Sequence, residues 1–182
     1  MEASSVESRL LLVSVFLVAA AGLVYELIAG TLATYLLGSS VTVFSLVIGI
    51  FLAAMGGGAW LAQFVRNGLA RWFVAAELAL ALLGGLSALL LFGAYVVSAD
   101  GFPVVLGLIC IGIGALVGLE IPILMRIVES GSSVRLAVSR VLAVDYVGAL
   151  LGSVLFPLVL LPHLGLVRTT ALLGLVNLAV AF

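Results

Sequence analysis

Long apolar runs divide the chain into six segments, which are separated by short breaks of polar or glycine residues. A helix that crosses a membrane needs roughly 20 apolar residues to span a hydrocarbon core of about 30 Å. The runs reach this length, and they lack the alternation and the short segments that are typical of β-barrel strands. We therefore expect an all-α, polytopic membrane helix bundle with spans at 10–38, 41–65, 70–97, 102–125, 141–161 and 164–182.

The arginines between the spans predict the orientation of the chain. Most breaks are short and rich in turn-forming residues, such as Arg66-Asn67-Gly68 and Pro162-His163, whereas the stretch 126–140 is longer and more polar. If the amino terminus lies in the cytoplasm, all the arginines except Arg168 fall on the cytoplasmic side. By the positive-inside rule, this distribution predicts that both termini are cytoplasmic.

Composition narrows the class of protein further. Of the 182 residues, 65% are hydrophobic and 8% are charged, whereas soluble domains carry about 25% charged residues. The net charge of −1 and the absence of lysine provide no basic surface for nucleic acid. The single cysteine, Cys110, excludes an internal disulfide and a multi-cysteine metal site. We expect no cofactor and no metal, and we expect the lipid bilayer as the first partner.

Acidic residues inside the apolar runs are the main candidates for function. A carboxylate within the bilayer costs a few kcal/mol, so it usually faces the bundle interior or a wet cavity. Glu77, Glu120 and Asp145 each lie five or six residues from an arginine, which places them about 8–9 Å inward from the cytoplasmic face. Glu26 lies deeper. We expect an acidic mouth that binds a long polyvalent cation; alternatively, each acid reaches the interface, pairs with an arginine or takes up a proton.

Small and polar residues suggest how the helices pack. Glycines at helical spacing let helices approach closely in lipid, and they form three pairs: Gly22 and Gly30, Gly114 and Gly118, Gly148 and Gly152. Candidate supporting residues for the acids are Tyr25, Tyr146 and Asn177. We find no nucleophile beside a base, because the only histidine, His163, falls in an outer turn. The sequence therefore predicts that this chain is not itself an enzyme.

A faint internal repeat relates the two halves of the chain. It aligns YELI (25–28) with LEIP (119–122), so that Glu26 corresponds to Glu120. Three helices in each half would give the halves opposite orientations. This is the 3+3 inverted repeat that is common in secondary transporters.

Four segments carry a family resemblance. They are GLVYELIAGTLATYLLG (22–38), VTVFSLVIGIFLAAMGGGAW (41–60), GLEIPILMRI (118–127) and VLAVDYVGALLGSVLFPLVLLPHLGLVRT (141–169). They resemble the amino-terminal multi-pass domain of membrane-bound spermidine synthase-like proteins, which are bacterial polyamine aminopropyltransferases. The resemblance implies a location in the bacterial inner membrane. It also implies a soluble, Rossmann-like domain that transfers an aminopropyl group from decarboxylated S-adenosylmethionine to putrescine; we expect this domain after residue 182.

Two functions remain open at this point. In the first, the chain binds or conducts putrescine or spermidine beside the synthase domain, through a cavity formed by Glu26, Glu77, Glu120 and Asp145. In the second, the chain is a membrane anchor and a scaffold for homo-oligomers, with no ligand of its own. The buried acids favour the first function, and the many small-residue motifs favour the second.

Overall fold

The chain folds into a bundle of helices. The computed structural model describes residues 5–38, 41–129 and 134–182, and these residues contain no strand, which confirms the predicted all-α class. The elements are α1 (Ser5–Leu37), α2 (Val41–Leu61), a 3₁₀ turn η1 (Ala62–Phe64), α3 (Leu69–Val97), α4 (Phe102–Glu129), α5 (Val134–Leu155), a π-helical segment η2 (Phe156–Leu160) and α6 (Leu161–Val180).

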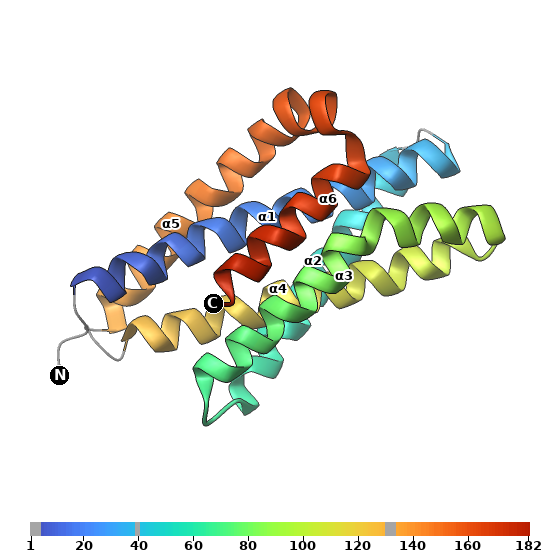
Figure 1. Cartoon of the computed structure of the whole chain (residues 1–182). Coiled ribbons are helices and arrows are strands. Elements are labelled where there is room, and N and C mark those ends of the chain that lie inside the picture. The colour runs from blue at the N-terminus through green and yellow to red at the C-terminus, as the bar shows by residue number, and fades with distance from the viewer. Residues whose placement is uncertain (1–4, 39–40, 130–133) are drawn as a thin grey trace.

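Five helical stretches in the described ranges are long and apolar enough to cross a membrane. The first four correspond to the first four predicted spans. The fifth, Arg135–Val180, has 46 residues and combines the two remaining spans. As one straight helix it would be about 69 Å long, more than twice the thickness of a hydrocarbon core. Instead, α6 folds back and runs opposite to α5 (Figure 1). The count of six separate crossings stays a prediction.

The corner between α5 and α6 lies at Gly165 rather than at the predicted break, Pro162-His163. Proline is tolerated in the first turn of a helix, where its missing N–H has no intrahelical partner to lose, and Pro162 occupies such a position in α6. At Gly165, φ is 69° and ψ is −178°, a conformation that is open almost only to glycine. The buried Thr169 hydroxyl donates a hydrogen bond to the Gly165 carbonyl at 2.6 Å.

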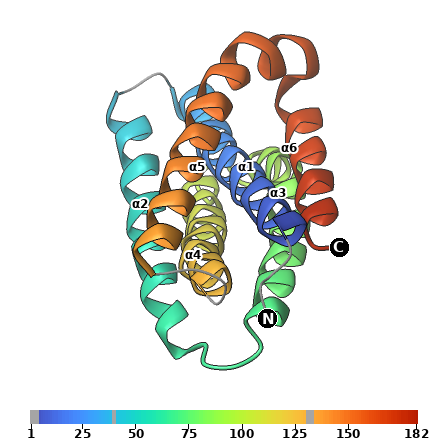
Figure 2. The same cartoon turned by 90° about the vertical axis from the view of Figure 1, so that its left-hand side faces the viewer.

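Helix α1 lies in the middle of the bundle and packs against all the other α-helices of the described chain (Figure 2). Around it, α4 packs against α2 and α3, and α3 also packs against α6. The core of the bundle includes the α1 side chains Tyr25, Ile28 and Leu32. The central position of α1 lets its side chains reach sites on several sides of the bundle.

The structure places the predicted packing glycines against neighbouring helices. Gly118 of α4 lies on the Met55 carbonyl of α2, and a Cβ at Gly114 would meet the Phe51 carbonyl at 2.8 Å. The other four contacts are Gly148 on Phe16, Gly152 on Ala20, Gly22 on Val117 and Gly30 on Phe44. Such close approach lets the backbones of α4 and α2, and of α5 and α1, pack directly against each other.

Candidate functional site

Glu26 of α1 and Asp145 of α5 line the same cavity within the bundle. The cavity has a volume of about 80 Å³, and both acidic side chains are partly buried. Because a water molecule occupies about 30 Å³, this space fits two or three waters or one ammonium group. The remaining lining residues are Ala19, Gly22, Leu23, Phe51, Met55, Val117, Ile121 and Ala149.

Glycine contacts bring the two acids together. Asp145 lies one turn before Gly148, which packs on the backbone of Phe16 in α1, so this face of α5 is turned toward α1. Glu26 lies one turn after Gly22, where the methyl groups of Val117 approach α1. The result is two carboxylates from different helices at a cavity whose other walls are mostly apolar. Such a site can bind a cation that has an apolar part.

Glu77 of α3 and Glu120 of α4 lie in a different place. Both side chains are 0% exposed, and none of their carboxyl oxygens has a hydrogen-bond partner. They lie near enough to each other and to Tyr25 of α1 that a negative charge on one acid would act on the other groups. The Tyr25 ring packs against Gly84 of α3, so closely that a Cβ at Gly84 would lie 2.5 Å from the Cζ atom of the ring. The Tyr25 hydroxyl also lacks a hydrogen-bond partner. We call Tyr25, Glu77 and Glu120 the buried polar cluster.

Asn177 of α6 lies at the same level of the bundle as Glu77. Gly85 of α3 approaches Thr170 and Gly174 of α6, and Gly174 also approaches Ala81. Residue numbers thus rise along α6 as they fall along α3, so the two helices are antiparallel. Three residues beyond Gly174, Asn177 therefore lies beside the turn of α3 that holds Glu77. Asn177 is 2% exposed and its Oδ1 atom has no hydrogen-bond partner.

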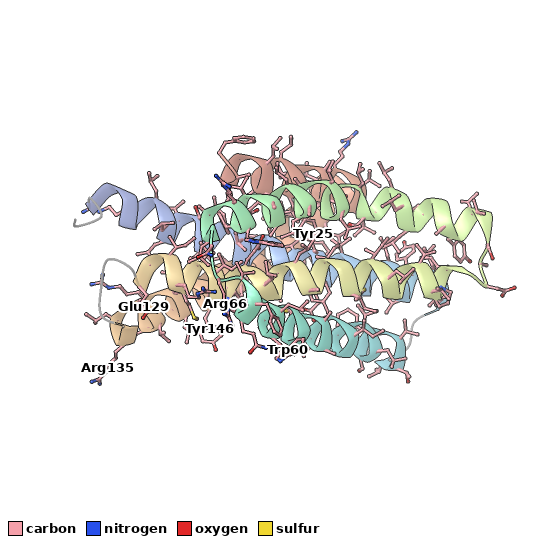
Figure 3. All side chains as sticks on the ribbon, turned by 90° about the horizontal axis from the view of Figure 1, so that it is seen from below. Tyr25, Trp60, Arg66, Glu129, Arg135 and Tyr146 are labelled. Carbon is pink, nitrogen blue, oxygen red and sulfur yellow. The ribbon has the colours of Figure 1, made fainter. Side chains whose placement is uncertain are left out.

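The structure therefore groups the candidate acids differently from the expected acidic mouth. Glu77 and Glu120 lie together, but Asp145 shares its cavity with Glu26, and neither Glu77 nor Glu120 lines that cavity. The two candidate tyrosines also differ. Tyr25 is 1% exposed inside the bundle, whereas Tyr146 is 68% exposed, on the outer side of α5 (Figure 3). Tyr146 is therefore exposed on the outside of the bundle and does not join either group of acids.

Arg126 has a structural role that our sequence analysis did not identify. Its Nη1 atom donates hydrogen bonds to the carbonyls of Ala62 at 3.2 Å and Val65 at 2.6 Å. These carbonyls follow the end of α2, where backbone acceptors lose their intrahelical partners. Arg126 thus connects α4 to the turn between α2 and α3, six residues after Glu120.

Comparison with known proteins finds relatives along nearly the whole chain. The identity is 48% over 171 residues with a polyamine aminopropyltransferase of Leptospira interrogans, 51% over 177 residues with polyamine aminopropyltransferase 2 of Ralstonia nicotianae, and 40% over 187 residues with a polyamine aminopropyltransferase of Mycobacterium tuberculosis. These alignments cover 94%, 96% and 99% of this chain, but only 34%, 34% and 36% of the relatives.

The chain thus spans about a third of the length of these relatives. It is homologous to one part of polyamine aminopropyltransferases, which confirms the resemblance predicted from the sequence. No family model and no solved structure matches the chain.

Proposed function

We propose that this relative of polyamine aminopropyltransferases is the membrane domain of a spermidine synthase-like protein, and that it binds and conducts a polyamine beside a linked synthase domain. The observation that carries the proposal is the cavity that Glu26 and Asp145 line together. In this proposal aminopropyl transfer belongs to the linked domain. The chain lies in the bacterial inner membrane with both termini in the cytoplasm.

The chemistry of the cavity suits one end of a polyamine. A polyamine alternates ammonium groups with methylene chains, so it needs both carboxylates and apolar contacts. Glu26 and Asp145 supply the carboxylates, and Leu23, Phe51 and Met55 supply apolar walls. A buried carboxylate binds a cation well only where the partner restores the solvation that the carboxylate has lost. At about 80 Å³ the cavity admits one ammonium end, while the rest of an extended polyamine lies outside it.

The helix contacts support the predicted inverted repeat. Exchanging the two halves turns the contact between α1 and α5 into the one between α4 and α2, and both contacts exist. The same exchange maps the contact between α3 and α6 onto itself. The alignment of YELI with LEIP also pairs Phe51 with Asp145 and Met55 with Ala149, which are the cavity residues of α2 and α5. The repeat would place the cavity on the axis between the halves, where transporters bind substrate.

A second candidate function is a membrane anchor that also holds copies of the protein together. The observation that favours it is a groove of about 430 Å³ on α2, which the exposed small residues Thr42, Ser45, Gly49 and Ala53 line together with Leu46 and Ile50. Small-residue faces of this kind let helices pack in lipid. If this function holds, Gly49→Leu converts a dimer into a monomer, as measured by the mass of the protein in detergent.

Thermal unfolding of the chain in detergent tests polyamine binding. Putrescine, spermidine, sodium and magnesium are compared at matched ionic strength. Ligand that binds only the folded state at a hundred times its Kd stabilises a protein by about 2.7 kcal/mol. We expect saturable stabilisation by spermidine that is lost in Glu26→Gln and Asp145→Asn. Ala149→Leu is also expected to abolish it, because it fills the cavity without changing its charge.

Two control variants keep this test specific. Ala143→Leu makes the same change on the exposed side of α5, and Glu129→Gln removes a carboxylate at the end of α4. Both variants should retain the stabilisation by spermidine. Stabilisation that survives Glu26→Gln would contradict the assigned site. The absence of any shift beyond the salt controls would contradict polyamine binding and leave the anchor as the better explanation.

A further inference from the structure

The strongest remaining feature of the molecule is the buried polar cluster, which polyamine binding at the Glu26 cavity does not use. We propose that Glu77 and Glu120, together with Tyr25, form a proton-binding site inside the bundle. The proposal does not depend on polyamine binding. It concerns different residues, which are buried side chains of α1, α3 and α4.

The balance of hydrogen-bond donors and acceptors points to a proton. Two ionised carboxylates can only accept hydrogen bonds, and all four of their oxygens here are buried without a partner. The Tyr25 hydroxyl, also unpartnered, interacts electrostatically with both acids and can supply a single donor. A proton on one carboxyl turns that group from an acceptor into a hydrogen-bond donor. It also removes the repulsion between two like charges that share a buried place.

The cluster is less suited to larger cations. Glu77 and Glu120 are 0% exposed, so a metal ion or an ammonium group would enter without its hydration shell and would need room among packed side chains. Among the described residues, no group of three histidine, cysteine or acidic side chains could hold a metal ion. A proton needs neither room nor a set of ligands.

In the described part of the chain, no arginine bonds to either acid, because all four carboxyl oxygens lack a partner. On α3 itself, Arg71 lies six residues before Glu77. Helix α2 carries no titratable side chain, and on α1 the group that interacts with the acids is Tyr25. On α4, Arg126 donates its hydrogen bonds to carbonyls at the end of α2. On α6, Arg168 lies nine residues before Asn177, the residue at the level of Glu77. On α5, Asp145 lines the other cavity.

Helix α1 connects the proton site to the cation cavity. Tyr25 belongs to the buried polar cluster, and the next residue, Glu26, lines the cavity. A change in the contact between α3 and α4 when the proton leaves would therefore act on the same turn of α1 that holds Glu26. If the proposed polyamine function holds as well, proton exchange at Glu77 and Glu120 can drive cation movement through the cavity.

Labelling with dicyclohexylcarbodiimide tests the proton site directly on the chain in detergent. This apolar reagent reacts with protonated carboxyl groups: the carboxyl oxygen bonds to the carbodiimide carbon, and the proton moves to a carbodiimide nitrogen. We expect an adduct on Glu77 or Glu120, located by peptide mass spectrometry. Once the pair loses its proton, each further pH unit should lower the labelled fraction about tenfold.

Variants determine whether the adduct reports this site. The double variant Glu77→Gln/Glu120→Gln should lose the adduct, whereas Glu26→Gln and Glu129→Gln should keep it. An adduct on Glu26 or Asp145 instead, or labelling that does not change with pH, would overturn the proposal. Protection by spermidine that persists in Glu26→Gln would assign the site to an ammonium group and would also overturn it.

Infrared spectroscopy provides a measurement that does not depend on a variant folding. A protonated carboxyl group in the wild-type chain gives a carbonyl band that is separate from the carboxylate bands and shifts in heavy water. We expect this band to disappear when the pH is raised, and Tyr25→Phe to shift it, because the Tyr25 hydroxyl interacts electrostatically with both acids. A wild-type spectrum with carboxylate bands alone at every pH would overturn the proposal.

Discussion

The two groups of acids differ in what surrounds them. Glu26 and Asp145 are partly buried, and they line a cavity of about 80 Å³ among α1, α2, α4 and α5. Glu77 and Glu120 are fully buried, and their oxygens lack partners. Yet the two groups meet at consecutive residues of α1: Tyr25 belongs to the group with Glu77 and Glu120, and Glu26 lines the cavity. One turn of a central helix thus faces two different environments.

This difference shows that the distance of an acid from the end of its helix does not determine which acids lie together. The rotation of each helix about its axis determines it, because side chains at equal depth can point to different neighbours. An acid beside a cavity can be solvated by water there, and a bound cation can replace that water. An acid sealed among side chains must be compensated inside the protein, since an uncompensated buried charge costs several kcal/mol.

The largest effect we predict comes from Gly118→Leu, which should damage both groups of acids at once. Helix α4 contributes Val117 and Ile121 to the cavity and Glu120 to the buried polar cluster. Gly118 lies directly on the Met55 carbonyl of α2, so a leucine would force the two helices apart. Overpacking of this kind costs about 3 kcal/mol or more where the backbone must move. Denaturation in mixed detergent micelles measures the loss.

Gly107→Leu provides the control on the same helix. No neighbouring atom lies within 4 Å of the position that a Cβ would take at Gly107. The leucine there should leave stability unchanged or raise it slightly, because glycine is a poor helix former. Equal losses in the two variants would mean that the contact between α4 and α2 does not limit stability.

The next effect separates the two groups. Replacing Glu77 and Glu120 together by methionine removes four buried oxygens without partners. Apolar replacement of a whole buried polar pair is neutral or stabilising, and we expect a gain of about 2 kcal/mol in the free energy of unfolding. Replacing Glu26 and Asp145 by methionine should change it by less than about 0.5 kcal/mol, because these side chains are partly exposed.

The opposite result would be equally informative. If the Glu77 and Glu120 double variant unfolds more easily than the wild type, the two carboxyl groups stabilise the bundle through the protons they hold. Labelling of Glu77 and Glu120 with carbodiimide would then report protons that hold the helices together. Unfolding of the wild type and of the double variant is therefore measured at several pH values. If the bound protons stabilise the bundle, the difference in the free energy of unfolding between the two proteins changes with pH.

The sequence predicted the helices well but not their rotation. Long apolar runs reveal helices because lipid requires every backbone group to be bonded within its own helix. Lipid is as apolar as leucine, however, so the pattern along Leu69–Val97 does not distinguish its lipid side from its buried side. The sequence therefore identified Glu77 and Asp145 as candidates but grouped them by depth. The structure places them in separate surroundings.

The sequence was more informative at turns whose backbone conformation few residue types can adopt. Gly68 ends the predicted break after Arg66, and its φ of 68° is one that glycine adopts readily. Proline was misleading at Pro162, because the first turn of a helix accepts it. The contact of Arg126 with Val65 could not be predicted, since it joins parts of the chain that are distant in sequence.

The smallest effect concerns the corner between α5 and α6. Asp145 precedes this corner on α5, and Asn177 follows it on α6. No neighbouring atom lies within 4 Å of a Cβ at Gly165, so Gly165→Ala adds only the strain of its φ of 69°, about 1–2 kcal/mol. Gly93→Ala adds the same methyl group to open space on α3 at an ordinary helical position, and should stabilise by up to about 1 kcal/mol.

Thermal unfolding of these two variants measures how firmly the corner holds α5 and α6 apart. A loss in Gly165→Ala with a gain in Gly93→Ala would show that the turn depends on the left-handed conformation. Equal changes would place the turn elsewhere in the segment from Phe156 to Thr169. In that case Asp145 and Asn177 would be positioned by their contacts with α1 and α3, and not by the corner between α5 and α6.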